Sequence, residues 1–249
     1  MYIATISVFP EIFAALEHGV IGNAAKNGLI TLEHLDLRNY TSDKHRTVDD
    51  RPYGGGPGMV MMVEPLKKAI QTAKEKAPLG IKTVYLSPQG KRFEQEIAKS
   101  SALAPGFIFV AGRYEGIDER LIESEIDEEW SIGDYVLSGG ELAAMVVIDS
   151  IVRLIPGVLG HGESANQDSF MNGLLDNPHY TRPECIDGLE VPKVLLSGDH
   201  QAIERWRLKQ ALGRTWKSRK DLINAYKMSE NEGLLLDEYI DEYEERGEK

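Results

Sequence analysis

The sequence predicts an α/β protein with a mostly parallel sheet, followed by a small helical domain. Strand-like and helix-like segments alternate through the first half of the chain. After Pro183 the strand pattern ends, and apolar residues recur at helical spacing instead. A polar stretch rich in turn-forming residues, 158–178, separates the two halves and indicates a linker.

The chain opens with a strand and a helix. Residues 2–9 are apolar enough for a buried strand, and Pro10 ends it. A helix follows, because Ile12, Leu16 and Val20 recur at helical spacing and form one apolar face. This pair is the first strand–helix unit of the predicted sheet.

Two further strands and two helices complete the first half. The second strand covers 81–86 and stops at the Ser-Pro-Gln-Gly run 87–90, after which a helix is predicted over 91–102. The third strand covers 107–110, and a helix over 140–154 closes this half of the chain.

The second half is predicted to be helical. Ile203, Trp206 and Gln210 share one helix, and residues 234–243 form the last one. The chain is therefore divided into an α/β domain, an interdomain linker and a helical domain, over 1–160, 161–174 and 175–249.

The chain is acidic, but its charge is unevenly placed. With 40 Asp and Glu against 28 Lys and Arg, the formal net charge is −12 at pH 7. This charge disfavours indiscriminate binding to nucleic acid, because phosphates are repelled by an acidic surface. Basic residues nevertheless dominate 193–220, whereas acidic residues dominate the tail 229–249, which looks unconstrained. A basic segment within an acidic protein fits selective contact with a polyanion.

Several protein classes are excluded. Cys185 is the only cysteine, so neither an internal disulfide nor a CxxC zinc site can form. The N-terminus lacks the features of a signal peptide, and no apolar run approaches the ~18 residues of a membrane span. The P-loop, the GxGxxG fingerprint, the GxSxG elbow and HExxH are also absent. We expect a soluble, cytoplasmic protein that does not contact membranes.

Three glycine-containing loops are the candidates for a binding site, and two of them follow predicted strands. They cover 87–90, 112–116 and 131–140. Ligands of open α/β sheets bind beyond the carboxyl ends of the strands, and glycine lets backbone amides approach a ligand closely. One such loop is more simply a strand end, but three in succession predict a cofactor pocket.

Several long strings point to a known family. They include HRTVDDRPYGGGPGMVMM at 45–62, YLSPQG at 85–90, GRYEGIDER at 112–120, EIDEEWSIGDYVLSGGE at 125–141, LLDNPHYTRPE at 174–184 and RWRLKQALGRTW at 205–216. From Met1 to about Lys220, the chain resembles the bacterial tRNA (guanine-N1)-methyltransferase family, TrmD.

The resemblance implies an enzyme that transfers a methyl group from S-adenosylmethionine to N1 of guanosine 37 of tRNA, beside the anticodon. It also implies a SPOUT-like fold with a deep trefoil knot, which spacing and periodicity do not show. Two alternatives stay open. One is a non-catalytic RNA-binding module that retained the scaffold, and the other is a knotted methyltransferase for another RNA base.

The cofactor loops of the family coincide with the three glycine-containing loops. The resemblance assigns the following residues to the cofactor: Leu86, Ser87, Pro88, Gly112, Glu115, Ile132, Gly133, Asp134, Tyr135, Val136, Leu137, Gly139 and Gly140. Without the resemblance, the apolar residues 135–137 would be assigned to core packing.

Asp168, in the string DSF, and Arg153 are the catalytic residues that the resemblance implies. The N1 proton must leave as the methyl arrives, and the Asp168 carboxylate can accept it. The Arg153 guanidinium can stabilise the negative charge that develops on O6. Taken alone, Asp168 fits a solvated residue or a helix cap, and Arg153 fits a cation at a helix C-terminus.

Members of the family are homodimers in which the linker aspartate serves the cofactor site of the partner. Because no predicted helix lies near Asp168, we expect it to gain a fixed position by docking on the partner subunit. Magnesium is associated with the activity of the family, and Glu115 and Asp168 are the carboxylates that could hold it. The sequence contains no set of metal ligands, so no metal site is predicted.

Two segments are candidates for tRNA contact. Loop 42–58 carries basic and aromatic residues around glycines, and the basic segment offers Arg214 and Lys217 as solvent-facing cations. Trp206 and Trp216 fit packing within a helical core better than stacking on bases.

Overall fold

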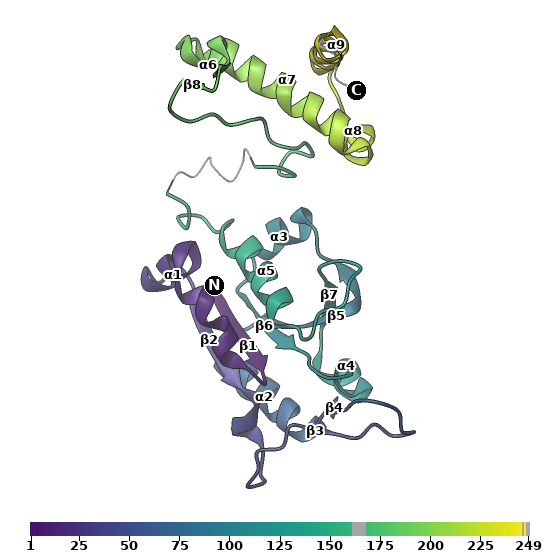
Figure 1. Cartoon of the computed structure of the whole chain (residues 1–249). Coiled ribbons are helices and arrows are strands. Elements are labelled where there is room, and N and C mark those ends of the chain that lie inside the picture. Colours follow the sequence, from purple (N-terminus) through teal and green to yellow (C-terminus); the bar gives the residue numbers. More distant parts are fainter. Residues whose placement is uncertain (161–167, 246, 248–249) are drawn as a thin grey trace. The chain divides into compact units, whose positions relative to one another are not determined.

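The computed structural model of the protein describes residues 1–160, 168–245 and 247. Two compact units make up the chain, Met1–Gly162 and Glu163–Lys249 (Figure 1). Residues 161–167 of the predicted linker lie outside the described residues. Within the part of the chain that the structure describes, no helix has both the length and the apolar character needed to cross a membrane.

The first unit contains a five-stranded sheet of order β2-β1-β6-β5-β7. Every neighbouring pair in it is parallel. The strands are β1 (Tyr2–Ser7), β2 (Thr31–Asp36), β5 (Lys82–Arg92), β6 (Gly106–Ala111) and β7 (Glu128–Ser131). The predicted parallel sheet is confirmed, and the trefoil knot implied by the resemblance stays a prediction.

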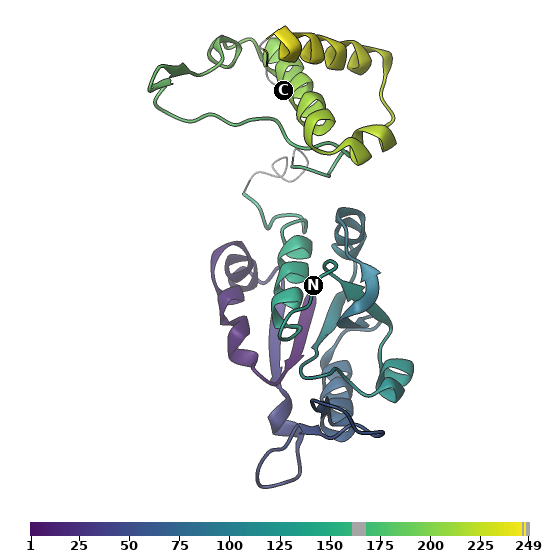
Figure 2. The ribbon, with the colours of Figure 1, turned by 45° about the vertical axis from the view of Figure 1, so that its right-hand side comes forward.

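Helices cover both faces of this sheet (Figure 2). One core contains residues of η1 (Pro10–Glu17), α1 (Gly19–Lys26), α3 (Gln95–Ser101) and α5 (Glu141–Val152). The other contains residues of η2 (Leu37–Tyr40), α2 (Val63–Lys76) and α4 (Glu119–Glu125). Successive strand residues alternate between the two cores: Phe109 packs in the first and Val110 in the second. Burial on both faces explains why the central strands are continuous apolar runs.

The two edge strands, β2 and β7, are missing from the sequence prediction. β2 carries Glu33 and His34, and β7 begins with Glu128 and Glu129. An edge strand pairs on one side only and tolerates charged side chains. Its sequence therefore lacks the apolar run by which the central strands are found.

The second strand is longer than predicted, and the expected helix over 91–102 is shorter. β5 continues through 87–90 to Arg92, and its register with β7 shifts within that run. At Gly90, a Cβ would lie 2.5 Å from the backbone nitrogen of Trp130, so glycine lets the two strands approach. The Ser-Pro-Gln-Gly run therefore bends the strand and does not end it.

The prediction of one helix with Ile12, Leu16 and Val20 on its apolar face is wrong. The chain forms the 3₁₀ helix η1 first, in which Phe13 and Leu16, three residues apart, are buried. Three residues per turn place side chains i and i+3 on the same side. Val20 lies in α1 and is 40% exposed.

The second unit is helical, with a small hairpin. Its elements are β8 (Cys185–Ile186), β9 (Leu189–Glu190), α6 (Lys193–Leu196), α7 (His200–Ser218), α8 (Lys220–Ala225) and α9 (Glu230–Glu245). Leu174, Leu212 and Leu235 form the centre of its core. The helical character of this half is confirmed.

The acidic tail is not unconstrained, because it forms α9 and packs against α7. Lys209 of α7 has a side chain only 8% exposed and binds Glu238 and Glu242 of α9 at 2.9 and 2.7 Å. Arg205 binds Glu238 as well, at 2.5 Å. The acidic residues of the tail therefore neutralise part of the basic segment.

Candidate active site

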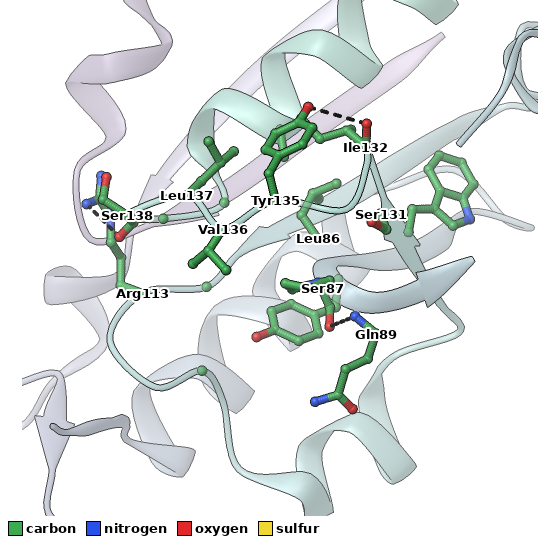
Figure 3. A pocket seen from close by; sticks show the side chains of 18 of the residues that line it. Leu86, Ser87, Gln89, Arg113, Ser131, Ile132, Tyr135, Val136, Leu137 and Ser138 are labelled. Atoms are coloured by element: carbon green, nitrogen blue, oxygen red, sulfur yellow. Dashed lines mark hydrogen bonds between the residues drawn. The ribbon is translucent and has the colours of Figure 1, made fainter. Parts of the chain in front are cut away.

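A cavity of about 320 Å³ opens beside the carboxyl ends of β6 and β7 (Figure 3). Three segments form its wall, namely 85–89, 112–116 and 130–140 without Asp134, and Ala143 of α5 completes it. Tyr135, Val136 and Leu137 lie on one side of the pocket, across from Leu86 and Ser87. The three loops singled out in the sequence thus surround one cavity.

All but one of the predicted cofactor residues line this cavity. Those that line it are Leu86, Ser87, Pro88, Gly112, Glu115, Ile132, Gly133, Tyr135, Val136, Leu137, Gly139 and Gly140. Asp134 does not: it is exposed and lies outside the wall of the cavity. The backbone N–H of Tyr135 donates to the carbonyl oxygen of Gly133 at 3.0 Å, and this tight turn leaves Asp134 on the outside.

Several residues of the wall are not among those assigned to the cofactor, although the predicted loops include six of them. They are Tyr85, Gln89, Arg113, Tyr114, Gly116, Trp130, Ser131, Ser138 and Ala143. Most are immediate neighbours of predicted residues within the same loops. Tyr85 and Trp130 are strand residues and are almost fully buried, so in the sequence they are indistinguishable from core.

Glycines bring the loops into contact at the floor of the cavity. The backbone N–H of Gly140 donates to the carbonyl oxygen of Gly112 at 2.8 Å. A Cβ at Gly112 would lie 2.8 Å from the ring of Tyr85, and a Cβ at Gly140 would lie 2.9 Å from Cα of Ala111. Side chains at these two positions would push the loops apart.

The loop before α5 is shaped by Gly133, whose φ of 147° disfavours other residues. A Cβ there would lie 2.5 Å from Cε1 of Tyr135. The Tyr135 hydroxyl donates to the carbonyl oxygen of Ile132 at 3.3 Å (Figure 3), so the ring folds back over its own loop. Val136 is 88% exposed and forms part of the rim.

Glu115 stands at the edge of the pocket, against the glycine-rich loop between β3 (Asp49–Asp50) and β4 (Val60–Met61). Its backbone N–H donates to the carbonyl oxygen of Met59 at 2.9 Å. A Cβ at Gly58 would lie 2.7 Å from Cγ of Glu115. The absence of a side chain at Gly58 therefore leaves room for this carboxylate.

Tyr114, next to Glu115, is held in an unusual backbone conformation. Its φ is 60°, in the left-handed region that costs a residue with a side chain on the order of 1 kcal/mol. Burial and the nearby Asp49 carboxylate raise the pKa of its phenol above the ordinary value. Strain of this kind is common in binding loops, and Tyr114 also lines the cavity.

Arg153 lies in the first unit, directly after α5. It is the C-terminal cap of that helix, and its backbone N–H donates to the carbonyl oxygen of Asp149 at 3.2 Å. It is half-buried and is not among the residues that line the 320 Å³ cavity.

Asp168 belongs to the second unit and lines a different cavity, of about 440 Å³. Asn172, Asp176, Glu204 and Arg207 line it as well. The two predicted catalytic residues, Arg153 and Asp168, therefore come from different units of the chain.

The turn that begins at Asp168 is held by the helices of its own unit, which corrects the expectation that nothing nearby fixes it. The backbone N–H of Met171 donates to the carbonyl oxygen of Asp168 at 3.2 Å. Leu174 is buried against Leu212, and the N–H of Leu175 donates to Oγ1 of Thr215 at 2.9 Å. The sequence gives no local sign of this anchoring, because the contacts come from α7, some forty residues on.

Five of the eight cations of the basic segment fall into two groups. Arg205 and Lys209 are bound by the acids of α9. Arg207 and Arg214 are exposed, and Arg214 thus faces solvent as predicted. Lys217 is also exposed, with its ammonium 4.5 Å from the centre of the Tyr243 ring.

The two tryptophans of α7 are half-buried, and each rests on a tyrosine. The ring of Trp206 lies 6.3 Å from that of Tyr180, and the ring of Trp216 lies 6.1 Å from that of Tyr243. Packing against other parts of the unit therefore accounts for both rings, as the sequence predicts.

The carboxylates proposed for magnesium do not lie together in one unit, since Glu115 is in the first and Asp168 in the second. Among residues 1–160, 168–245 and 247, no three His, Cys, Asp or Glu side chains gather in a way that could hold a metal ion.

Comparisons with known proteins give matches over nearly the whole chain. The tRNA (Guanine-1)-methyltransferase TrmD family matches residues 1–225. The tRNA (guanine-N(1)-)-methyltransferase of Aeromonas hydrophila is 60% identical over 243 residues, which cover 97% of this chain and 98% of that protein. The enzyme of the same name from Sodalis glossinidius is 59% identical over 247 residues, 99% of this chain and 98% of that protein. That of Coxiella burnetii is 60% identical over 242 residues, 97% of this chain and 98% of that protein.

Proposed function

Because the chain belongs to the tRNA (guanine-1)-methyltransferase family TrmD, we propose that it methylates guanosine 37 of tRNA with S-adenosylmethionine bound in the 320 Å³ cavity. The enzyme is a tRNA (guanine-N1)-methyltransferase. We further propose that S-adenosylmethionine is the methyl donor, that position 37 of tRNA is the target and that individual residues act as described below. The proposal also includes a homodimer and a cytoplasmic location.

The observation that carries the proposal is the glycine-lined cavity. The ring of Tyr85 at Gly112 and the backbone of Ala111 at Gly140 occupy the place of a Cβ, so these two glycines let the loops close around the cavity. Leu86, Val136 and Leu137 provide apolar wall for an adenine ring or a methylthio group. The residues present therefore fit S-adenosylmethionine, which supplies an electrophilic methyl group when it is bound.

In the proposed chemistry, N1 of guanine forms a bond to the methyl carbon as the bond from carbon to sulfur breaks. The carboxylate of Asp168 accepts the proton that leaves N1. The guanidinium of Arg153 stabilises the negative charge that develops on O6. Glu115 and Asp168 stay the candidate carboxylates for magnesium, and no step is assigned to the metal.

The proposal includes a homodimer in which Asp168 of one subunit serves the cofactor cavity of the other. An apolar surface supports this arrangement. Leu142 and Val146, one helical turn apart on α5, are 53% and 49% exposed, and Tyr135 and Val136 beside the cavity are also exposed. Exposed apolar side chains that follow one face of a helix are typical of a surface that binds another subunit.

We assign tRNA contact to Arg214 and Lys217 of α7 and to the loop 42–58. Arg214 and Lys217 are exposed, and in that loop Arg51 and Tyr53 are exposed too. Cations and an aromatic ring on a surface suit phosphates and an unpaired base.

Nucleoside analysis tests the proposed reaction. Unmodified tRNA with guanosine at position 37, and the same tRNA with adenosine there, are incubated with the enzyme and methyl-labelled S-adenosylmethionine. We expect labelled 1-methylguanosine from the first tRNA only, detected by mass spectrometry of the digested nucleosides. Label in the adenosine-37 tRNA would show that another position is used, and the absence of label in both would show that this donor is wrong.

A further inference from the structure

A buried carboxylate stands behind the proposed donor cavity. Glu141, at the start of α5, is 1% exposed. Its Oε1 accepts a hydrogen bond from the hydroxyl of Ser7 at 2.6 Å and lies 3.0 Å from Nε of Arg113. Its Oε2 is buried and has no hydrogen-bond partner among the described residues. Buried ion pairs contribute little to net stability, because desolvation offsets their attraction. This placement therefore suggests a role other than stability.

Arg113 connects the two loops of the cavity that follow β6 and β7. Its Nε binds Glu141, and its NH1 donates to the carbonyl oxygen of Ser138 at 3.2 Å (Figure 3). Its guanidinium carbon lies 4.9 Å from the centre of the Phe9 ring, which supports it from the β1 side. The backbone of Arg113 belongs to the first loop and the carbonyl of Ser138 to the second, so one guanidinium holds both.

The space around this pair is shaped for it. A Cβ at Gly139 would overlap Nε of Arg113 and would lie 2.5 Å from Oε2 of Glu141. Beside it, the N–H of Gly140 donates to the carbonyl oxygen of Gly112 at 2.8 Å. The two loops therefore meet at their backbones, and the ion pair fills the place of the missing side chain.

We propose that Glu141 is a positioning residue for methyl-donor binding. By holding the guanidinium of Arg113, it fixes the distance between the loop 112–116 and the loop 131–140. This inference rests on the proposed function, since it takes the cavity between these loops as the site of S-adenosylmethionine. Glu141 is not one of the residues that line the cavity, so it acts through Arg113.

The first test replaces Glu141 with glutamine, which keeps the shape and removes the charge. Charge-assisted hydrogen bonds are roughly twice as strong as neutral ones, so Glu141→Gln should weaken S-adenosylmethionine binding on the order of 10-fold, measured by titration calorimetry. The KM for the donor should rise, while the KM for tRNA and kcat at saturating donor stay near those of the wild type. Glu119→Gln, an exposed acid in the first turn of α4, is the matched control and should change neither KM.

The second test uses Arg113→Lys, because a lysine keeps the charge but cannot bind Glu141 and Ser138 together in the fork geometry of arginine. It should also raise the KM for the donor. The double variant should have a donor KM no higher than that of the single variant that binds the donor more weakly. Additive losses, or an equal rise in the KM for tRNA, would overturn the positioning role. So would normal donor binding by Arg113→Lys, which decides the question if Glu141→Gln does not fold.

The proposed function is tested separately in the same experiment. Wild-type enzyme that does not bind S-adenosylmethionine contradicts the assignment of the cavity. If the wild type binds S-adenosylmethionine and both Glu141→Gln and Arg113→Lys bind it equally well, only the positioning role of Glu141 is contradicted, and the assignment of the cavity stands.

Discussion

Lys209 of α7 donates from its ammonium to the carboxylate of Glu238 on α9 across 2.9 Å. Hydrogen bonds from Arg205 and Lys209 to the charged carboxylate lower the pKa of Glu238 to about 2. The family match ends at residue 225, so this contact joins a helix within the match to one beyond it. α9 is thereby an integral part of the helical unit.

Glu238→Gln should destabilise the helical unit, because it removes the charge that Arg205 and Lys209 share. We expect a loss of about 1 kcal/mol in the free energy of unfolding at pH 7, the usual worth of a hydrogen bond. Hydrogen exchange across α7 measures this loss. The control is Glu244→Gln, an exposed acid on α9, the helix that also carries Glu238. Equal protection in both variants would contradict the prediction.

The pH dependence of this contribution follows from the lowered pKa of Glu238. The folded pKa of about 2 is below the ordinary value of 4.5, so the native state binds the proton more weakly. The contribution is present above pH 4.5 and is lost as the pH falls from 4.5 towards 2. The Glu238→Gln variant should lack this part of the acid destabilisation of the wild type.

His34 should make the first unit less stable as the pH falls below about 6.5. Burial lowers the pKa of its imidazole, although the charge of Glu17 acts in the opposite direction. The ring stacks on Phe13, and Nε2 is buried with no hydrogen-bond partner among the described residues. Because the folded pKa is below the unfolded one, stability is present above pH 6.5 and is lost as the pH falls through the folded value.

Proton NMR of the imidazole and urea unfolding between pH 5 and pH 8 check the role of His34. His34→Phe keeps the stack on Phe13 and should flatten the pH dependence of the free energy of unfolding. His18→Gln, at an exposed histidine, should leave it unchanged. An ordinary pKa for the imidazole of His34 would refute the prediction.

Gly133→Val should abolish or severely weaken S-adenosylmethionine binding while the fold survives. The valine would have to adopt a φ of 147° and would meet the ring of Tyr135, so the loop before α5 would move. Titration calorimetry measures the affinity, and circular dichroism reports on the fold. Gly160→Val is the control, since no atom of the described residues lies within 4 Å of a Cβ there. Unchanged affinity in Gly133→Val would place the donor elsewhere.

Asp168→Asn should separate binding from catalysis. The amide keeps the shape of the side chain but cannot accept the N1 proton, so methyl transfer should fall by a factor on the order of 10²–10⁴. Single-turnover kinetics at saturating donor and tRNA measure the loss. Donor binding should stay near normal, as in the control Asp241→Asn, an exposed acid on α9. Turnover close to that of the wild type would remove Asp168 from the mechanism.

Mixing the Asp168→Asn and Gly133→Val proteins tests the shared site. After subunits exchange, one site of a heterodimer combines an intact donor loop from the first chain with an intact Asp168 from the second. The other site carries both defects, so activity should return to at most about half that of the wild type per heterodimer, as two-fold symmetry requires. If demonstrated heterodimers stay inactive, Asp168 serves its own chain.

The central strands and the loops around the cavity could be predicted from the sequence because their signals are local. Phe109 and Val110 lie in an apolar run, and Gly112 and Gly133 mark loops where a side chain would collide. The charged edge strand β2 carries no such signal.

The rest depends on contacts between distant residues. Arg113 and Glu141 are 28 positions apart. The amide of Leu175 donates to the hydroxyl of Thr215, which lies 40 positions later in the chain. Neither pair has a spacing that identifies it before the chain is folded. Asp134 shows the converse case, because a residue within a binding loop can still point out of the site when a tight turn rotates it away.

The packing of Leu174 against Leu212 joins the turn of Asp168 to α7. In the proposed mechanism, the carboxylate that accepts the N1 proton therefore belongs to the same helical unit as Arg214, which is proposed to contact tRNA. When this unit binds to a surface, Asp168 and Arg214 are therefore brought to that surface together. Under this proposal, a change that displaces the helical unit should impair both tRNA binding and proton transfer.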